Sequence, residues 1–434
     1  MKCLVTGAYG FIGGAVVEAL RREGLTVIGA GRDVEFARRI NPAIEWIACD
    51  FNKDVTPQDW APRLAGVDVV VNCVGILQRN LRDRPERIHK QATIALFEAA
   101  AASGVRRIVH ISAVSAEAEV PTAYARSKAE ADAALERIDA DWLIVKPSLV
   151  IGRGAFGGTA LMRGLAGLPF ALLLPGEGRE RFQPIALDDL ARGIARLAAQ
   201  HEPARRTLDA AGPETVSLRE ILVAYRNWLG FGRAHEIALP LLFLRLLLRL
   251  GDVAGYVGYV TSARTTSLEQ LRYDTLVDGA EFAAAAGGDV KGFSATLAAW
   301  PATLQDRLHA RSFFAVPLLH VAVSFFWILT GVLTLTPSSF ASATALLAHA
   351  GFGELMAKAV VAAGSVADII AGALFLLPDW VRRAGVAQLI LSAIYAVGLS
   401  VVAPELWADH FGPLLKVLPM MAATLVVMAY QEKR

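Results

Sequence analysis

Tyr124 and Lys128 lie one helical turn apart in "YARSK", at the start of a predicted helix, so both side chains project from the same face. A phenol is a poor base at neutral pH, but a nearby ammonium group lowers its pKa by favouring the phenolate. Tyr124 could then act as a general acid/base when a carbonyl and an alcohol interconvert. Lys128 would also reach the ribose of a nicotinamide. The same spacing is common on protein surfaces, so its meaning depends on the elements around it.

A glycine-rich segment, "TGAYGFIG" at Thr6–Gly13, follows the first predicted strand and opens the first predicted helix. Gly7 allows a tight turn, Gly10 lets a pyrophosphate approach the backbone, and Gly13 lets the helix pack closely on the strand. The amino end of the helix then faces the phosphates. This pattern predicts a dinucleotide site, with ordinary turn glycines as the alternative. The expected cofactor contacts are Gly7, Tyr9, Gly10, Phe11, Ile12 and Gly13.

Arg32 follows the second predicted strand, where a site selective for NAD would place an acidic residue on the ribose hydroxyls. A guanidinium there, with Asp33 only afterwards, suits the 2′-phosphate of NADP because arginine offers charge and a planar fork of donors. The sequence therefore favours NADP(H), with NAD(H) possible. The alternative interpretation of Arg32 is a solvated loop charge. Asp50, which ends the third strand, could accept a hydrogen bond from the adenine amino group or be an ordinary loop acid.

Short runs rich in β-branched residues alternate with longer Ala- and Leu-rich stretches from Met1 to about Gly230. This alternation predicts right-handed crossovers and a parallel sheet covered on both faces, which is the doubly wound α/β class. The expected helices include 13–22, 87–103 and 124–138. The expected strands are "KCLVTG", "LTVIGAG", "IEWIACD", "VDVVVNCVG", "RRIVHIS", "DWLIVKPS" and "TLDAAG".

The chain of 434 residues carries a net charge of +2, which gives no electrostatic reason to expect nucleic-acid binding. Its cysteines lack zinc-ligand spacing, and no metal site is predicted. Hydrophobic residues make up 54% and charged residues only 19%, and the deficit of charge falls mainly after residue 311. This distribution excludes a purely soluble protein. It predicts a nucleotide-binding domain at 1–230, a helical connecting or substrate-side segment at 231–311, and a membrane domain at 312–434.

Four apolar stretches of the last part are long enough, or nearly so, for the ~20 residues that cross a bilayer. They are 313–336, 355–377, 384–403 and 412–430. Basic residues gather on one side of these stretches, namely Arg307 and Arg311, Arg382 and Arg383, Lys433 and Arg434. The positive-inside rule then predicts a multi-pass protein of the inner (plasma) membrane, with both termini and the nucleotide-binding domain in the cytoplasm.

Two further features concern the bilayer. The segment around Arg245 and Arg249 is strongly apolar, and it could lie along a bilayer surface with its arginines at the headgroups, or pack on the soluble domain. Asp368 lies near the middle of the second predicted span, with His320 as a candidate partner at similar depth. Asp368 could serve a proton- or quinone-linked site, or it could be a hydrogen-bonded structural residue.

Up to about residue 230 the chain resembles the extended or atypical branch of the short-chain dehydrogenase/reductase family. Within that family it is most similar to proteins like the NADPH-binding accessory subunit of mitochondrial respiratory complex I. The last part resembles DoxX-like four-helix membrane domains, in hydropathy more than in motifs. The first resemblance rests on segments that occur in the family's order, which are "TGAYGFIG", "VNCVGIL", "HISAVS", "YARSK", "VKPSLVIGRG", "FQPIALDDLA" and "DAAGPETVSLREIL".

The resemblance implies that Tyr124 is the catalytic acid/base, and that Lys128 lowers its pKa and binds the ribose. It also implies that the ends of the fourth and sixth strands contact the cofactor. The residues concerned are Asn72, Val74 and Gly75 beside the cofactor, and Pro147 and Ser148 beside the nicotinamide.

Two positions depart from the family's pattern. Catalytic members place a Ser or Thr at the end of the fifth strand to orient the substrate oxygen, often as the second of a serine pair. Here Ser112 is followed by Ala113, with Ser115 two positions further, so either hydroxyl could serve or the position could be empty. Many extended members also carry an Asn in the fourth helix, and its best match is His89, either a proton relay or an ordinary helix residue. Both departures weaken the case for catalysis and leave cofactor binding untouched.

Three hypotheses follow. The first is a membrane-anchored NADP(H)-dependent oxidoreductase acting on a carbonyl or hydroxyl of a lipid-like, isoprenoid or quinone-like molecule at the cytoplasmic face. The second is a non-catalytic NADPH-binding structural or assembly component of a membrane complex of the respiratory type. The third makes the nucleotide-binding domain a sensor for redox work in the membrane domain, to which Asp368 and His320 would belong.

Overall fold

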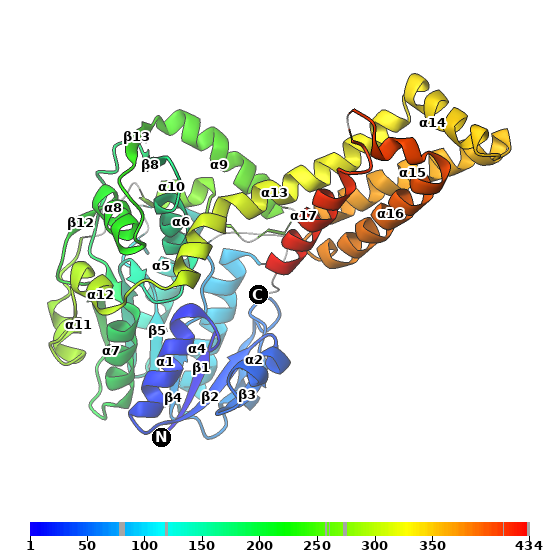
Figure 1. Cartoon of the computed structure of the whole chain (residues 1–434). Coiled ribbons are helices and arrows are strands. Elements are labelled where there is room, and N and C mark those ends of the chain that lie inside the picture. Colours follow the sequence, from blue (N-terminus) through cyan, green and yellow to red (C-terminus); the bar gives the residue numbers. More distant parts are fainter. Residues whose placement is uncertain are drawn as a thin grey trace. The chain divides into compact units, whose positions relative to one another are not determined.

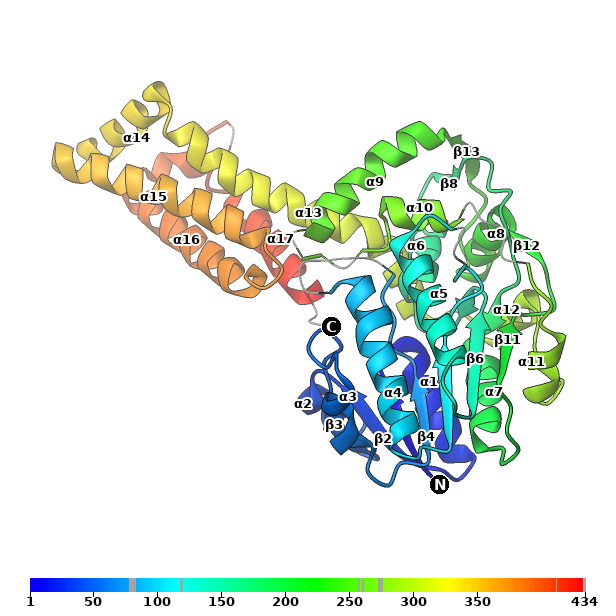
Figure 2. The same ribbon diagram turned by 180° about the vertical axis from the view of Figure 1, so that it is seen from behind.

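The computed structural model of the chain describes residues 1–77, 83–117, 120–256, 258–259, 261–271, 276–410 and 412–431. The chain separates into two compact units, Met1–Ala310 and Arg311–Arg434. Figures 1 and 2 show the first unit as a sheet covered by helices and the second as a group of long helices. The segment from residue 231 to Ala310 therefore belongs to the first unit.

A seven-stranded parallel sheet forms the centre of the first unit, in the order β11-β6-β5-β4-β1-β2-β3. Each strand corresponds to one of the seven predicted segments, so the doubly wound α/β class is confirmed. The strands are β1 (Lys2–Thr6), β2 (Thr26–Gly31), β3 (Glu45–Ala48), β4 (Val69–Asn72), β5 (Arg107–Ile111), β6 (Trp142–Pro147) and β11 (Arg206–Ala210).

Helices cover both faces of this sheet (Figures 1 and 2). In β1, Val5 packs into the core of one face and Leu4 into the core of the other, because alternate residues of a strand point in opposite directions. The first core includes α1 and α7, and the second includes α3, α4 and α5. These helices are α1 (Phe11–Arg22), α3 (Pro57–Trp60), α4 (Thr93–Ala102), α5 (Ala123–Glu136) and α7 (Leu187–Ala199).

The predicted helix at 87–103 forms in two parts. Residues Glu86–Ala92 make a π-helical turn, and the regular helix α4 begins at Thr93. In a π turn the hydrogen bonds run between residues five apart rather than four, which widens the helix locally and redirects its side chains. His89 lies inside this turn.

A third hydrophobic core of the first unit lies outside the large sheet. It is formed by side chains of α6, α8 and α12 and of the short strands β7, β8, β9 and β12. The short strands of this region pair as β7–β10, β9–β12 and β8–β13. The elements of this region and the remaining helices of the unit are β7 (Val150–Ile151), α6 (Gly157–Ala166), β8 (Ala171–Pro175), β9 (Arg181–Phe182), β10 (Ile185–Ala186), β12 (Val216–Ser217), α8 (Leu218–Trp228), β13 (His235–Leu239), α9 (Leu241–Tyr256), α10 (Thr265–Leu271), α11 (Ala280–Ala285), α12 (Phe293–Ala299) and α2 (Val34–Ile40).

Within the described residues, three helices are long and apolar enough to cross a membrane: α13 (Leu304–Thr334), α15 (Glu354–Phe375) and α16 (Val381–Val402). They correspond to the first three predicted spans, and a further helix, α14 (Pro337–His349), forms in a predicted connection. In the fourth predicted span, 412–430, the helix is shorter than the predicted stretch. It is α17 (Val417–Tyr430), which starts after Gly412, with a positive φ of 53°, and has Pro419 in its first turn, where a helix tolerates proline. At ~1.5 Å per residue α17 reaches about 21 Å, short of the ~30 Å hydrocarbon core.

The short helix α17 nevertheless runs back along α16. The side chain of Arg382, at the start of α16, donates a hydrogen bond to the backbone carbonyl of Gln431 at 3.3 Å. The side-chain amide of Gln431 donates to the backbone carbonyl of Pro378 at 3.5 Å. The last described residue therefore lies at the same end of the second unit as the turn between α15 and α16. Lys433 and Arg434, which the orientation prediction also used, lie outside the described residues.

Asp368 is buried inside the second unit and is hydrogen-bonded. The hydroxyl of Tyr395, on α16, donates to Asp368 Oδ1 at 2.8 Å. His320, the partner expected from its depth, is bonded through Nε2 to the backbone carbonyl of Phe375 at 2.6 Å. The structure therefore favours Tyr395, rather than His320, as the side chain that satisfies this carboxyl group.

Candidate functional site

The glycine-rich segment forms the predicted tight turn between β1 and α1. Gly7 has a φ of +67°, a left-handed conformation that disfavours any β-carbon. Its carbonyl oxygen accepts a hydrogen bond from the Gly10 N–H at 2.8 Å. A β-carbon on Gly13 would lie 2.1 Å from that carbonyl oxygen, so only glycine lets α1 approach the turn this closely. The three glycines make a cradle of bare backbone at the carboxyl end of β1.

The amino end of α1 can receive an anion. The helix begins at Phe11, and no side chain caps its first N–H groups because the preceding residue is Gly10. The Phe11 ring is stacked on Phe156, with ring centroids 5.2 Å apart, and Ile12 packs against the sheet core. Phe11 and Ile12 therefore offer backbone N–H groups to a ligand rather than side chains. Such groups at a helix amino end favour phosphate, so the cradle fits the pyrophosphate of a dinucleotide.

Tyr9 lies against the carboxyl end of β2. Its ring packs on Gly31, where a β-carbon would come within 2.3 Å of a ring carbon. Its hydroxyl accepts hydrogen bonds from the backbone N–H groups of Arg32, at 3.1 Å, and Asp33, at 3.3 Å. Tyr9 thus holds the turn that carries Arg32, where the adenosine ribose of a Rossmann dinucleotide would lie.

Arg32 forms an ion pair with Asp83, an acidic residue that the sequence did not identify as part of the site. Its Nη1 lies 2.7 Å from Oδ1 of Asp83, and the same oxygen accepts a hydrogen bond from the side-chain amide of Asn52 at 2.8 Å. The Arg32 side chain remains 53% exposed, so part of the guanidinium is open to a ligand. Asp50 accepts a hydrogen bond from the backbone N–H of Asn52 at 3.0 Å, which is the behaviour of an ordinary loop acid.

Asn72 ends β4 and is fully buried. Its Oδ1 accepts hydrogen bonds from the Thr6 hydroxyl at 2.7 Å and the Val74 N–H at 3.2 Å, and its Nδ2 lies 3.2 Å from Nδ1 of His110. The side chain of Asn72 therefore joins the ends of β1, β4 and β5 inside the protein. Val74 lies under the glycine turn, since its Cγ2 would be 3.2 Å from a β-carbon on Gly7.

Lys128 lies in the second turn of α5 and is buried. Its Nζ donates a hydrogen bond to the backbone carbonyl of Ile111, at the end of β5, at 2.7 Å. A β-carbon on Gly75 would lie 3.6 Å from Lys128 Cε, so the lysine passes beside the end of β4. Burial lowers the pKa of Lys128 to about 8. Because a buried ammonium group costs free energy, its presence here points to a chemical role.

Tyr124, one turn before Lys128, is half-buried. The ring of His89 meets its ring edge-on, with centroids 5.5 Å apart. Burial and, secondarily, the charge of Asp132 raise the pKa of Tyr124. This direction is opposite to the lowering predicted from Lys128, because the lysine ammonium group is directed at the Ile111 carbonyl. Tyr124 is therefore a neutral hydroxyl at physiological pH in this arrangement.

Ser112 follows β5, and its hydroxyl donates a hydrogen bond to Oδ2 of Asp132 at 2.7 Å. Both side chains are buried, and burial raises the pKa of Asp132. Lys146 Nζ lies 3.6 Å from the same carboxylate oxygen. The serine expected to orient a substrate therefore stabilises a buried carboxylate instead, and Ala113 leaves the next position without a hydroxyl. Sequence reasoning missed Asp132, although it lies one helical turn beyond Lys128.

His89 is buried in the π-helical turn, and both of its ring nitrogens are bonded. Nε2 accepts a hydrogen bond from the Ile76 N–H at 2.9 Å, so Nδ1 carries the proton, and it lies 3.0 Å from Ser127 Oγ on α5. Burial, together with the charge of Lys128, lowers the pKa of His89 well below its ordinary value. The neutral ring therefore ties the loop after β4 to α5.

Pro147 and Ser148 lie at the end of β6. The Pro147 carbonyl accepts a hydrogen bond from the Val114 N–H at 3.1 Å. Ser148 is buried, and its hydroxyl finds no hydrogen-bond partner in the part of the chain that the structure describes. A buried hydroxyl without a partner costs free energy, so a polar ligand group would be favoured there. This hydroxyl and the cradle at Gly7 both fit a dinucleotide lying across the carboxyl ends of the strands.

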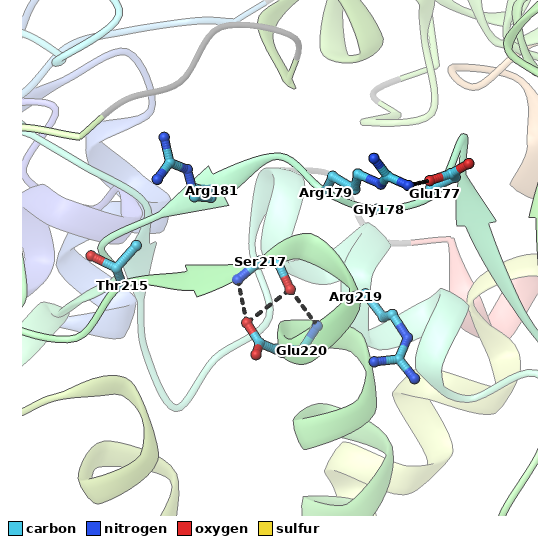
Figure 3. A pocket seen from close by; sticks show the side chains of 8 residues that line it. All are labelled: Glu177, Gly178, Arg179, Arg181, Thr215, Ser217, Arg219 and Glu220. Atoms are coloured by element: carbon cyan, nitrogen blue, oxygen red, sulfur yellow. Dashed lines mark hydrogen bonds and ion pairs between the residues drawn. The ribbon is translucent and has the colours of Figure 1, made fainter.

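A separate cleft of about 410 Å³ lies in the region of the third core (Figure 3). Its lining residues are Glu177, Gly178, Arg179, Arg181, Thr215, Ser217, Arg219 and Glu220, none of which the sequence predicted as functional. Figure 3 shows Arg179 paired with Glu177, and Ser217 and Glu220 closing the first turn of α8. Arg219 is bonded to Glu236 at 2.9 Å. Much of the positive charge of this cleft is therefore matched by carboxylates of the protein itself.

Two family models match parts of the chain. Residues 7–164 match a family described as NAD(P)H-binding, and residues 324–425 match the DoxX-like family. The first match includes the glycine cradle together with Tyr124 and Lys128. The second includes the last part of α13 and all of α15 and α16.

Curated relatives match the nucleotide-binding part. The NADH-ubiquinone oxidoreductase 40 kDa subunit of Neurospora crassa is 25% identical over 230 residues, which are 50% of this chain and 57% of that protein. A ceramide reductase of Caulobacter vibrioides is 28% identical over 151 residues, which are 35% of this chain and 46% of that protein. The chain thus spans about half the length of the curated relatives it matches.

A solved structure shows the same fold. The UDP-glucuronic acid 4-epimerase of Bacillus cereus, in complex with UDP-glucuronic acid and NAD, superposes with a TM-score of 0.52 at 17% identity, covering 72% of this chain and 100% of the epimerase. Together with the NAD(P)H-binding family match, this superposition confirms a Rossmann fold in the first part of the chain. The chain therefore joins an NAD(P)-binding Rossmann domain, distantly homologous to the 40 kDa subunit of NADH-ubiquinone oxidoreductase, to a DoxX-like domain with helices long enough to cross a membrane.

Proposed function

We propose that the protein is a membrane-anchored NADP(H)-dependent oxidoreductase that interconverts a carbonyl and a hydroxyl group on a lipid-like molecule. The observation that carries this proposal is the position of Tyr124 and Lys128 one turn apart on α5, with Lys128 beside Gly75. The apolar helices of the second unit would hold such a site near molecules dissolved in a bilayer. The name of the ceramide reductase relative, which specifies a lipid, supports the same substrate class.

Burial raises the pKa of Tyr124 and keeps its hydroxyl protonated, as a proton donor to a carbonyl must be. A bound nicotinamide supplies the hydride that reaches the carbonyl carbon of the substrate. The Tyr124 hydroxyl gives its proton to the carbonyl oxygen, which completes the alcohol. To stabilise the phenolate that remains, the Lys128 ammonium group, one turn away, must turn from the Ile111 carbonyl toward Tyr124. A hydroxyl with a raised pKa is protonated and ready for this role, whereas the reverse reaction would need it ionised.

The arginines of the second unit support a cytoplasmic position for the first unit. Arg382 and Arg383 lie at the turn between α15 and α16, and Arg311 precedes the apolar part of α13. The positive-inside rule places such residues in the cytoplasm. Because Gln431 contacts the same turn, both ends of the membrane domain would lie on the cytoplasmic side although α17 is short.

Transfer of deuterium from labelled NADPH tests this proposal. The full chain, purified in mild detergent, is incubated with NADPH deuterated at the transferable position and with a long-chain ketone or a short water-soluble ketone. We expect deuterium at the carbinol carbon of the long-chain alcohol, detected by mass spectrometry, and much less in the short alcohol. Tight NADPH binding without deuterated alcohol would contradict the enzymatic proposal, and equal labelling of both alcohols would contradict the lipid-like substrate.

Arg32 and Asp83 should set the preference between the two cofactors. Replacing Arg32 by Gln removes a charged donor from the ribose end, worth about 1.5–3 kcal/mol, and should weaken NADPH binding roughly 10- to 100-fold. NADH binding should change little. Asp83→Asn should strengthen NADPH binding, because the guanidinium then loses its competing carboxylate. Calorimetric titration of both variants with both cofactors measures this.

The matched control for Arg32→Gln is Arg39→Gln, an exposed arginine on α2. It changes the net charge equally and should leave both affinities unchanged. Equal losses of NADPH affinity in the two variants would show that the change in net charge alone causes the effect. That result would contradict a 2′-phosphate site at Arg32.

A second candidate function is a non-catalytic NADPH-binding component of a membrane complex. The bond between Ser112 and Asp132, with Ala113 beside it, favours this alternative because the usual substrate-orienting hydroxyl is occupied. The similarity to the 40 kDa subunit of NADH-ubiquinone oxidoreductase points the same way. This candidate predicts that NADPH stays bound through purification, that other membrane proteins co-purify, and that no deuterated alcohol forms.

A further inference from the structure

Helix α9 presents a row of large apolar side chains to its surroundings. Leu242 is 81% exposed, Leu246 60%, Leu250 68% and Val253 60%. These positions recur every three or four residues, so they form one stripe along the helix. Figures 1 and 2 show α9 at the edge of the first unit, beside α10. A contiguous apolar stripe of this kind on a folded domain marks an interaction surface.

The opposite face of α9 is packed against the protein, so the helix cannot turn the stripe inward. A β-carbon on Gly251 would lie 1.8 Å from the Ala263 carbonyl oxygen, and one on Gly255 would lie 2.6 Å from Arg264 Nη1. Arg264 Nε is also 3.1 Å from Asp252 Oδ1. The close backbone contact and the buried ion pair fix the rotation of α9 about its axis, with the leucines outward.

Two arginines lie along one margin of the stripe. Each residue of a helix is rotated by about 100° about the axis from the one before. Arg245 and Arg249 therefore lie next to each other around the helix, between the packed face and the leucines, and both are exposed. On the same helix the single acidic residue, Asp252, is already paired with Arg264. Within the described part of the chain, the exposed face therefore combines apolar side chains with the positive charge of two exposed arginines. This combination suits an interface where hydrocarbon and anionic headgroups meet.

We propose that α9 lies in the headgroup region of a bilayer, with Leu242, Leu246 and Leu250 inserted toward the acyl chains and the two arginines at anionic headgroups. A lipid surface is favoured over a protein partner because the same chain carries helices long enough to span a membrane. The two arginines also match the charge of anionic lipids. The proposal does not rest on the proposed oxidoreductase activity, because a purely nucleotide-binding protein would use α9 in the same way.

Site-specific quenching in the intact protein tests the proposal. The full chain carrying Leu246→Cys is labelled with a nitrobenzoxadiazole fluorophore and reconstituted in vesicles of phosphatidylcholine and phosphatidylglycerol. We expect lipids brominated on the upper acyl chain to quench the probe about twofold, and aqueous iodide to quench it weakly. Leu250→Cys repeats the measurement one turn further along the helix. The unsubstituted chain, labelled in parallel, measures any signal from the native cysteines, of which Cys73 is the half-buried one.

The matched control is Glu35→Cys, an exposed position on α2. Its probe should show the reverse pattern, with strong quenching by iodide and little by brominated lipid. Strong iodide quenching at Leu246→Cys and Leu250→Cys would place α9 in water and overturn the proposal. Protection from both quenchers would show that protein covers the stripe, either the second unit or another chain, and would overturn it equally. Replacing Arg245 and Arg249 by Gln should raise iodide quenching at Leu246→Cys.

Discussion

Replacing Tyr124 by Phe is expected to lower kcat for ketone reduction by roughly 10²- to 10⁴-fold, the range of a lost general acid. The Kd for NADPH should change less than about threefold, because the phenyl ring keeps its edge-on contact with His89 and only the hydroxyl is lost. Deuterium transfer gives kcat, and calorimetric titration gives the Kd. The two readouts separate a catalytic role of the hydroxyl from a role in cofactor binding.

Tyr225→Phe is the matched control, since it removes one oxygen from a tyrosine in the third core, away from the cradle. Its turnover should equal that of the unsubstituted protein. Unchanged turnover in Tyr124→Phe would remove Tyr124 from the mechanism, and parallel losses in both variants would attribute the effect to general destabilisation. Absence of turnover in the unsubstituted protein would favour the non-catalytic alternative.

Replacing Gly13 by Ala should weaken NADPH binding about 100-fold or more. Its β-carbon would overlap the Gly7 carbonyl oxygen at 2.1 Å, so the turn and α1 must separate. Overpacking of this kind costs about 1–3 kcal/mol or more, and each 1.4 kcal/mol is tenfold in affinity. The displacement also moves the N–H groups that would hold the pyrophosphate. Calorimetric titration with NADPH measures the effect, and thermal unfolding shows whether the variant is folded.

Gly14→Ala is a close control for this variant. A β-carbon on Gly14 would lie 3.7 Å from the Ala8 carbonyl oxygen, which is ordinary contact, and alanine favours the helix by about 1 kcal/mol. NADPH affinity should therefore be preserved and thermal stability should rise. Preserved affinity in Gly13→Ala, with the protein folded, would show that the dinucleotide does not use this turn.

The seven strands of the sheet could be predicted because each is a short apolar run with polar or glycine-rich flanks. In β1, for example, Leu4 and Val5 must both be apolar, since the two faces of a doubly wound sheet are both covered. The cradle could be predicted for a similar reason. Its function depends on Gly7, Gly10 and Gly13, which lie together where β1 leads into α1. Because these glycines are close in the sequence, they are also close in space, and their pattern in the sequence is enough to locate the cradle.

The partners of Arg32 and Ser112 could not be predicted in this way. Asp83 reaches Arg32 from a loop after β4, and the contact exists only because β2 and β4 both end at the same edge of the sheet. Asp132 and Ser112 come from α5 and β5. The Ser112 hydroxyl points to a buried carboxylate rather than to a substrate. A residue pattern does not show the direction of a side chain, so the sequence could not reveal this.

The start of the helix in the fourth predicted span could not be read from hydropathy. Mean hydropathy over 412–430 counts apolar residues and is insensitive to backbone conformation, whereas a helix tolerates Pro419 only in its first turn, and α17 begins at Val417. Pro419 was therefore the available signal. Gln431 forms a hydrogen bond to Pro378, which is distant in the sequence. A hydropathy profile averages neighbouring residues and cannot predict such a long-range contact.

The π-helical turn at Glu86–Ala92 carries more than the side chain of His89. Its backbone holds one residue more than a regular helical turn would. Hydrogen bonds of His89 with Ile76 and Ser127 join this turn to the loop after β4 and to α5. We therefore expect that any opening of the turn would release the loop and the start of α5 together, beside Tyr124 and Lys128.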